Sequence, residues 1–482
     1  MTNPTPGAPE FELRAEPQKV KFSTLEGLRL LCSLTNHSSD ASEIPTPFDR
    51  SGSLNVLLSE GRKPVRAMNR LTRQSALNGG RVDSSLDVDV LPAGEAWTWN
   101  MDMASFHYGI PPSDYILSTH YDYEPQGISI KDGPYRLRVL DTPLLQLQEI
   151  RDNPILDGLT LLFSAYGESG TEYYLHLYNP GRPVGPWWAV RILEGVPAEN
   201  PFCASANFFQ TESTDEFHRK WIVWTQDGQV CAQCYLRGAA VASPVAAPIP
   251  EGCHLIRSAV RTRENELWLF FRNSGGELEA HRFHESTLQR IFAHRARWTE
   301  GEPVAIVGDE TSFHVATSWR GIIYDHVAQN GRLIDRFHVL RTRLRPVSFT
   351  FDAAVLRLRA AFRDNPNGKV LQLAVVDIPA DSVVSATFNG LPVRGHMMET
   401  AFDRDSAGRI HILFSTSADK LLYYSEGRGP VLVCEGEGPF FPVVVGGAAP
   451  YLGSYRGSLG YRFVRYIPKR RGRKFVGEEP HG

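Results

Sequence analysis

The chain has 482 residues, of which 42% are hydrophobic and 22% charged, and its formal net charge is −3 at pH 7. This composition excludes a disordered or collagen-like chain and provides no overall field that would attract nucleic acid or an anionic membrane. The 33 prolines and 41 glycines, without a long run of helix-forming residues, favour an all-β fold of short strands and tight turns.

The N-terminus combines prolines with acidic residues and has no continuous apolar stretch of the kind found in secretory signals. No apolar run of about 18 residues occurs elsewhere, so we expect no transmembrane segment. Six scattered cysteines do not form the pattern of a disulfide framework. We therefore expect a cytoplasmic protein with a disordered segment at residues 1–10, and the excess of arginine over lysine hints at a bacterial genome.

Residues 11–141 contain several segments in which apolar and polar residues alternate, as in strands with one buried and one exposed face. Val88 and Val90, for example, are predicted to face the core, with Asp87 and Asp89 on the solvent side. Turn clusters separate these segments, so they predict an antiparallel β-sandwich. The alternating segments are 29–36, 53–60, 85–91, 96–103 and 135–141.

Three short motifs in this region carry a resemblance to a known domain type. They are "CSLTNHS" near the start, "LPAGE" at the middle turn and "IPPSDYIL" before the last strands. In this order they resemble the immunoglobulin-like domains of the bacterial intracellular proteinase-inhibitor kind. The resemblance implies an immunoglobulin-like sandwich in which Tyr115 forms a tyrosine corner. It also implies a protease-inhibitor-like module as one alternative function.

The remaining chain repeats an apolar strand, a polar turn and a second strand. The spacing is mostly that of a four-stranded propeller blade, and the inner strands are nearly continuous apolar runs, as expected where both faces of a sheet are buried. Residues 157–467 therefore predict a β-propeller of seven blades, with six or eight as alternatives. Residues 142–156 are a linker or a strand that closes the ring beside the C-terminal strand. The predicted hairpins are 159–179, 220–238, 265–284, 312–329, 356–377, 409–427 and 451–467.

One of these units, "AFDRDSAGRIHILFSTSADKLLYYS" at 401–425, resembles the blades of sialidase-like propellers, which often carry a D-x-x-G-x-x-H-x-x-F/Y turn and strand. The resemblance implies the architecture alone, because the chain has no Asp box and no segment carrying the first sialidase arginine. A glycan-binding or sialidase-like propeller is therefore kept as an alternative function.

Two motifs imitate metal sites. Cys231 and Cys234 form a C-x-x-C, but they follow the predicted Asp227-Gly228 hairpin turn and so lie on one strand, where their Cα atoms are about 10 Å apart and their side chains point to opposite faces. His281 and His284 diverge for the same reason. A third group has suitable ligand atoms without a recognisable spacing. It comprises His107, His120, Asp122 and Glu124. We therefore predict no metal, cofactor or catalytic residue.

Arginine provides the better candidates for a binding site, because guanidinium groups can hold carboxylate or phosphate in a bidentate way. One group lies in the third hairpin unit and another enters the fifth. The basic tail at 468–482 is predicted to be disordered. Nucleic acid is not expected to be a partner except through this tail. The predicted binding residues are Arg257, Arg261, Arg263, Arg343, Lys469, Arg470, Arg471 and Arg473.

The sequence thus favours a non-catalytic interaction scaffold in which the propeller face binds a protein or another macromolecule. The observations behind this hypothesis are the rigid repeat and the lack of a recognisable catalytic set of residues. A protein is the favoured partner, and a glycan is the alternative.

Overall fold

The computed structural model places most of the chain, and every structural statement concerns the residues that it describes. These are 10–46, 54–68, 88–103, 110–142, 144–153, 158–167, 170–178, 188–193, 199–205, 219–236, 239–261, 266–284, 286–296, 303–309, 311–352, 356–364, 370–389, 397–416, 420–425, 428–435, 441–446, 451–455 and 461–465.

The chain forms two compact units. Unit 1 comprises Met1–Pro143 with the short segments Arg182–Arg191 and Gly457–Tyr461, and unit 2 comprises the rest. No helix in the described part of the chain has the length and apolar character needed to cross a lipid bilayer.

Unit 1 is built from strands whose apolar faces share one core. Leu34 in the three-stranded sheet, Leu117 in the five-stranded sheet and Ile44 in the two-stranded ribbon all belong to the same buried cluster. Two sheets that pack around one core form a β-sandwich. The sheets, in spatial order, are β1 (Phe11–Pro17), β3 (Arg29–Asn36) and β8 (Ala96–Asp102); β2 (Lys21–Ser23), β10 (Ile128–Leu140), β9 (Ser113–Tyr123), β5 (Leu54–Glu60) and β6 (Lys63–Met68); and β4 (Ser42–Pro45) with β7 (Val88–Leu91). One 3₁₀ turn, η1 (Glu124–Gln126), lies between β9 and β10.

Two details of the sandwich test the sequence prediction. The hydroxyl of Tyr115 donates to the carbonyl of Pro111 at 2.7 Å, which is the hydrogen bond of a tyrosine corner. The predicted burial of Val88 and Val90 is wrong, because these side chains are 47% and 46% exposed. Among the described residues, their strand β7 pairs only with the four-residue β4, and of the residues in β7 only Leu91 reaches the core.

From Leu144 onward the chain, most of which is unit 2, forms antiparallel sheets that follow one another in sequence. Each of the hairpins predicted from the sequence is present as a pair of neighbouring strands. The strands are β11 (Leu144–Asn153), β12 (Gly158–Gly167), β13 (Gly170–Tyr178) and β14 (Trp188–Leu193); β15 (Glu199–Ser205), β16 (Arg219–Gln226), β17 (Gln229–Leu236), β18 (Ala239–Ala240) and β19 (Val245–Pro248); β20 (His254–Arg261), β21 (Glu266–Arg272), β22 (Leu278–His284) and β23 (Thr287–His294); β24 (Val304–Gly308), β25 (Ser312–Ser318), β26 (Gly321–Ala328) and β27 (Leu333–Arg341); β28 (Arg345–Asp352), β29 (Arg357–Arg363), β30 (Val370–Asp377) and β31 (Ser382–Asn389); β32 (Met397–Arg404), β33 (Ile410–Thr416), β34 (Lys420–Ser425) and β35 (Arg428–Glu435); and β36 (Val443–Val445), β37 (Tyr451–Tyr455) and β38 (Tyr461–Arg465).

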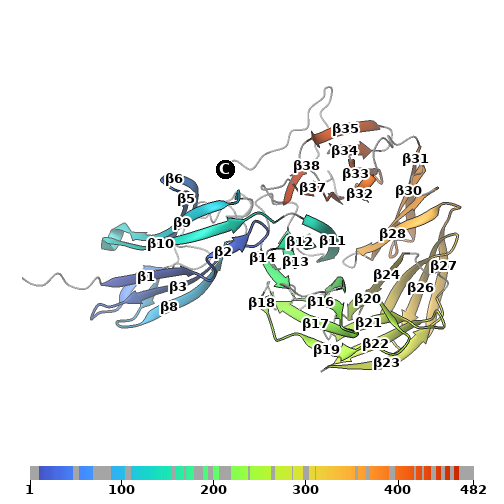
Figure 1. Cartoon of the computed structure of the whole chain (residues 1–482), viewed down its shortest axis with the longest axis horizontal. Helices are drawn as coiled ribbons and strands as arrows, with labels where there is room; N and C mark the ends of the chain where they lie inside the picture. The colour runs from blue at the N-terminus through green and yellow to red at the C-terminus, as the bar shows by residue number, and fades with distance from the viewer. Residues whose placement is uncertain are drawn as a thin grey trace, which may run out of the picture. The chain divides into compact units, whose positions relative to one another are not determined.

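The cores of unit 2 lie between successive sheets. Along β21, Leu269 and Phe271 pack toward the sheet of β16 and β17, whereas Trp268 and Phe270 pack toward the sheet of β24 and β25. Three further clusters join the later sheets to their neighbours in the same order. This double burial explains the continuous apolar runs in the sequence. In Figure 1 the sheets of unit 2 follow one another around a common centre, and the architecture is a β-propeller.

The segment predicted as a linker or ring-closing strand contains β11. This strand is antiparallel to β12, and at Arg151 it also pairs with Asp352 of β28 in the parallel sense. Among the described strands, β38 joins β36 and β37 rather than β11. The described residues thus show β12 and, at one residue, β28 as the partners of β11, and the ring-closing role of residues 142–156 stays a prediction.

Candidate functional site

The structure places part of the predicted arginine set. Arg257 lies half-buried on β20 and donates to the carbonyl of Ile256 at 3.2 Å, and burial lowers its pKa. Arg343 is exposed in the connection between β27 and β28. Arg257 and Arg343 thus do not lie on a common sheet. Arg261 lies on β20 without a described side chain, and the other members lie outside the described residues. Those are Arg263, Lys469, Arg470, Arg471 and Arg473.

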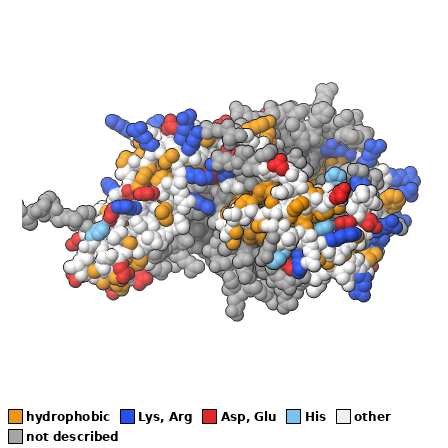
Figure 2. All heavy atoms as spheres, turned by 60° about the horizontal axis from the view of Figure 1, so that its bottom comes forward, with side chains coloured by type: hydrophobic (Ala, Val, Ile, Leu, Met, Phe, Trp, Pro, Cys, Tyr) orange, Lys and Arg blue, Asp and Glu red, His pale blue; other side chains and the backbone are white. Residues whose placement is uncertain are grey.

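Exposed basic side chains nevertheless gather in one region of unit 2. Arg332, Arg341, Arg343 and Arg345 flank or lie within the strands β27 and β28, and all four are exposed. Figure 2 shows Lys and Arg side chains gathering along its right-hand edge, which is the side on which Figure 1 places β27. Of these four arginines, only Arg343 was predicted from the sequence as a binding residue.

The cysteine motif lies on a strand, as predicted. Cys231 and Cys234 are both on β17, opposite Trp224 and Trp221 of β16, and neither forms a disulfide. The turn before them has positive φ at Asp227 (50°) and Gly228 (73°), the conformation of a tight hairpin.

The predicted divergence of His281 and His284 is also confirmed. His281 is buried on β22 and contacts Glu279 at 3.1 Å, whereas His284 is exposed. In unit 1, His120 contacts Asp122 at 3.0 Å on the partly exposed side of β9. His107 and the side chain of Glu124 lie outside the described residues.

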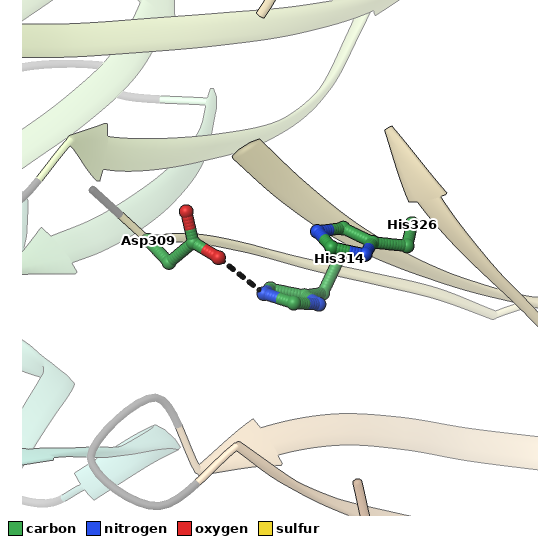
Figure 3. A group of neighbouring side chains, drawn as sticks. All are labelled: Asp309, His314 and His326. Atoms are coloured by element: carbon green, nitrogen blue, oxygen red, sulfur yellow. Dashed lines mark hydrogen bonds and ion pairs between the residues drawn. The ribbon is translucent and has the colours of Figure 1, made fainter. Parts of the chain in front are cut away.

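A group of three side chains that the sequence analysis missed meets at one end of the sheet β24–β27 (Figure 3). Asp309 follows β24, His314 lies on β25, and His326 lies opposite His314 on β26. The Nε2 atom of His314 is 2.8 Å from Oδ2 of Asp309, and its ring stacks on that of His326 with centroids 4.8 Å apart. We call these three residues the Asp-His-His cluster. Their ligand atoms lie within 4.8 Å of one another.

Neighbouring groups hold the cluster in place. Ser312 donates to Oδ2 of Asp309 at 2.7 Å and also contacts Nε2 of His326 at 2.7 Å. The Nδ1 atom of His314 is hydrogen-bonded to the hydroxyl of Tyr324. His314 therefore has a partner on each ring nitrogen, which fixes the orientation of the imidazole.

The charges of the cluster follow from these contacts. Burial would raise the pKa of Asp309, but hydrogen bonds from His314, Ser312 and the backbone of Thr311 outweigh it and hold that pKa well below its usual range. Burial, and then the neighbouring His314, lower the pKa of His326. Asp309 is therefore ionised and His326 is neutral at pH 7. A carboxylate beside neutral imidazole is the donor set that transition metals prefer.

Part of this arrangement recurs in the sheet β32–β35. Nε2 of His411 is 3.1 Å from Oδ2 of Asp405, and its Nδ1 bonds the hydroxyl of Tyr423 at 2.5 Å. Asp405 and His411 are the Asp and His of the motif that resembles sialidase-like blades. Both are buried in this network, so they stabilise the blade and do not support glycan binding. The same motif search does not find Asp309 and His314, because these two residues are five positions apart rather than six and have no glycine between them.

Replacing Tyr423 by phenylalanine should lower the free energy of unfolding by about 1–3 kcal/mol, because it removes the hydroxyl bonded to a buried imidazole nitrogen. Urea denaturation of the full chain measures the change. The control is Tyr424→Phe, since the hydroxyl of Tyr424 has no hydrogen-bond partner in the described structure. Equal effects of the two substitutions would contradict a stabilising role for the Asp-His-Tyr network.

No protein-family profile and no curated protein matches the chain. Three similar solved structures are the Cps50 (Swd1) β-propeller domain of Myceliophteria thermophila, AofleA of Arthrobotrys oligospora, and BBS1N in complex with ARL6DN. The first is 10% identical and covers 68% of this chain and 100% of its own, with a TM-score of 0.40. AofleA is 9% identical and covers 62% and 87%, with a TM-score of 0.38. BBS1N is 11% identical and covers 68% and 98%, with a TM-score of 0.35.

Proposed function

We propose that this chain is a non-catalytic interaction scaffold with a seven-bladed propeller that binds an acidic, extended segment of a protein partner along β27. The observation that carries the proposal is the exposure of this strand. Leu333, Ile334 and Phe337 on β27 are 39%, 47% and 48% exposed. Solvent-exposed apolar side chains gathered on one strand are typical of a surface that is covered by a partner.

Other outer strands of unit 2 differ from β27. In β23, Leu288 and Ile291 are partly buried, whereas β31 exposes one large apolar side chain, Val383, and β35 exposes two, Val431 and Leu432. Among the described outer strands of unit 2, β27 thus exposes the most large apolar side chains.

The position of β27 favours an extended ligand. It is the last strand of the sheet β24–β27, so one edge of its backbone lacks a neighbouring strand in the described structure. Such an edge can accept an additional strand through main-chain hydrogen bonds, while alternate side chains provide specificity.

The charge around β27 favours an acidic ligand. Arg332, Arg341, Arg343 and Arg345 are exposed, and none forms an ion pair with a described carboxylate. Arg336 is already paired with the buried Asp325 and is not counted. Four unpaired guanidinium groups beside an apolar edge would attract carboxylates and orient them by bidentate contacts.

A peptide-display selection on the full chain tests the proposal. We expect the selected peptides to combine acidic residues with β-branched or aromatic residues, and their binding to weaken strongly at about 0.5 M salt because the contacts are exposed. The double variant Arg341→Glu and Arg343→Glu should weaken binding by at least about tenfold, since like charges would then face each other. The control is Arg136→Glu, which changes an exposed arginine on β10.

Peptides that bind the double variant as tightly as the original chain would contradict the basic surface. Peptides that still bind after Ile334→Pro, which interrupts the edge without adding charge, would contradict the strand-like mode. Circular dichroism of each variant establishes that it is folded.

A further inference from the structure

The Asp-His-His cluster belongs to a longer row of side chains across one sheet. His314 on β25 is directly opposite His326 on β26, which is directly opposite Asp335 on β27. Directly opposed residues in antiparallel strands lie on the same face of the sheet. With Asp309 at the end of β24, the row reads Asp, His, His, Asp. Asp335 is exposed.

We propose that this row binds one divalent transition-metal ion, for which Zn²⁺ is the probe. Two imidazoles and a carboxylate are a common ligand set for Zn²⁺, and the carboxylate of Asp335 completes four-coordination by rotation of an exposed side chain. The ligand atoms of the Asp-His-His cluster are within 4.8 Å of one another, so modest side-chain movements bring them around one ion.

The hydrogen bonds at His314 suit a metal ligand. Its Nε2 atom already faces Oδ2 of Asp309, and its Nδ1 atom already faces the hydroxyl of the buried Tyr324. When the Nε2 lone pair turns to a metal, the proton resides on Nδ1 and is donated to the oxygen of Tyr324. Histidine ligands usually donate their second nitrogen to an oxygen in this way, which orients the ring.

His326 must change its orientation. Its ring is nearly parallel to that of His314, with an interplanar angle of 13°. Two stacked rings cannot both direct in-plane lone pairs at one ion, so His326 turns and leaves Ser312. His326 is half-buried, and Ser312 keeps its contact with Asp309.

The sheet β32–β35 provides an internal comparison. The same Asp, His and Tyr are present there, but His411 is opposite Ser425, and Ser425 is opposite Arg428. A hydroxyl and an arginine thus occupy the positions of His326 and Asp335. The Asp-His-Tyr network accordingly stabilises both sheets. The additional ligands His326 and Asp335 occur only in the sheet β24–β27.

Calorimetric titration of the chelator-treated full chain with Zn²⁺ tests the proposal. We expect one equivalent to bind, and His326→Ser to weaken the binding by at least about 100-fold, the upper end of the loss seen when even an outer partner is removed. Serine is tolerated at the matching position in β34, so this variant should fold. Asp335→Asn should weaken binding less. The control is His338→Ser, an exposed histidine on β27 outside the row, which should bind Zn²⁺ like the original chain.

Equal Zn²⁺ affinity in the original chain and in His326→Ser would overturn the proposal, as would the absence of any binding by the original chain. Substitution with Co²⁺ identifies the donors, because cysteine ligands give an intense thiolate-to-cobalt charge-transfer band in the near ultraviolet. Such a band would place the ion on cysteine instead. The test leaves the arginines beside β27 unchanged, so its outcome does not depend on peptide binding.

Discussion

Replacing Asp325 by alanine is expected to lower the free energy of unfolding by about 3–5 kcal/mol, because the change breaks a buried charge network. The Asp325 side chain is 1% exposed. Its Oδ1 and Oδ2 accept hydrogen bonds from Arg336 at 2.6 and 2.8 Å, and Oδ2 is 2.8 Å from Nε2 of His294. His294 belongs to β23 and Asp325 to β26, so this carboxylate joins two successive sheets.

The control is Asp335→Asn, which removes an exposed carboxylate from the neighbouring strand β27 and should change the stability by less than about 0.5 kcal/mol. Urea denaturation at pH 7 measures both variants. If Asp325→Ala were as stable as the original chain, the contacts of Asp325 with Arg336 and His294 would make no net contribution to the free energy of unfolding.

The same network predicts how stability depends on pH. Burial would raise the pKa of Asp325, but hydrogen bonds and charges from Arg336 and His294 outweigh it and lower that pKa below the ordinary value of 3.8. Because the folded pKa is depressed, the stabilisation is complete above the unfolded pKa and is lost as the pH falls through the folded pKa. The difference in unfolding free energy between the original chain and Asp325→Ala should therefore shrink below about pH 4.

The hairpins of unit 2 were predictable because local signals and packing agree. Positions such as Leu269 and Trp268 are apolar in succession since each faces a different neighbouring sheet, and turns such as Asp227-Gly228 need residues that accept positive φ. The predicted burial of Val88 and Val90 was wrong because alternation shows which residues share a face of a strand, but not whether another sheet covers that face.

The candidate site was much less predictable. Asp309, His314 and His326 are brought together by the register between β25 and β26, which a search for fixed spacing in the sequence does not detect. The link from His294 to Asp325 depends in addition on the packing of two sheets. Exposed Arg343 was found because arginine content is visible in the sequence, but the apolar edge beside it appears only with the strand order.

Truncation of Phe313 to alanine should also have a large effect, lowering the free energy of unfolding by about 3–5 kcal/mol. Phe313 on β25 is fully buried between two sheets, and its ring centroid is 4.9 Å from that of Trp268 and 5.1 Å from that of Phe270. Removing the ring creates a cavity that rigid strands on both sides cannot fill. The control is Leu333→Ala on exposed β27, expected within about 0.5 kcal/mol of the original chain. A loss of less than about 1 kcal/mol for Phe313→Ala in urea denaturation would mean that the sheets close over the cavity and that their packing is adaptable.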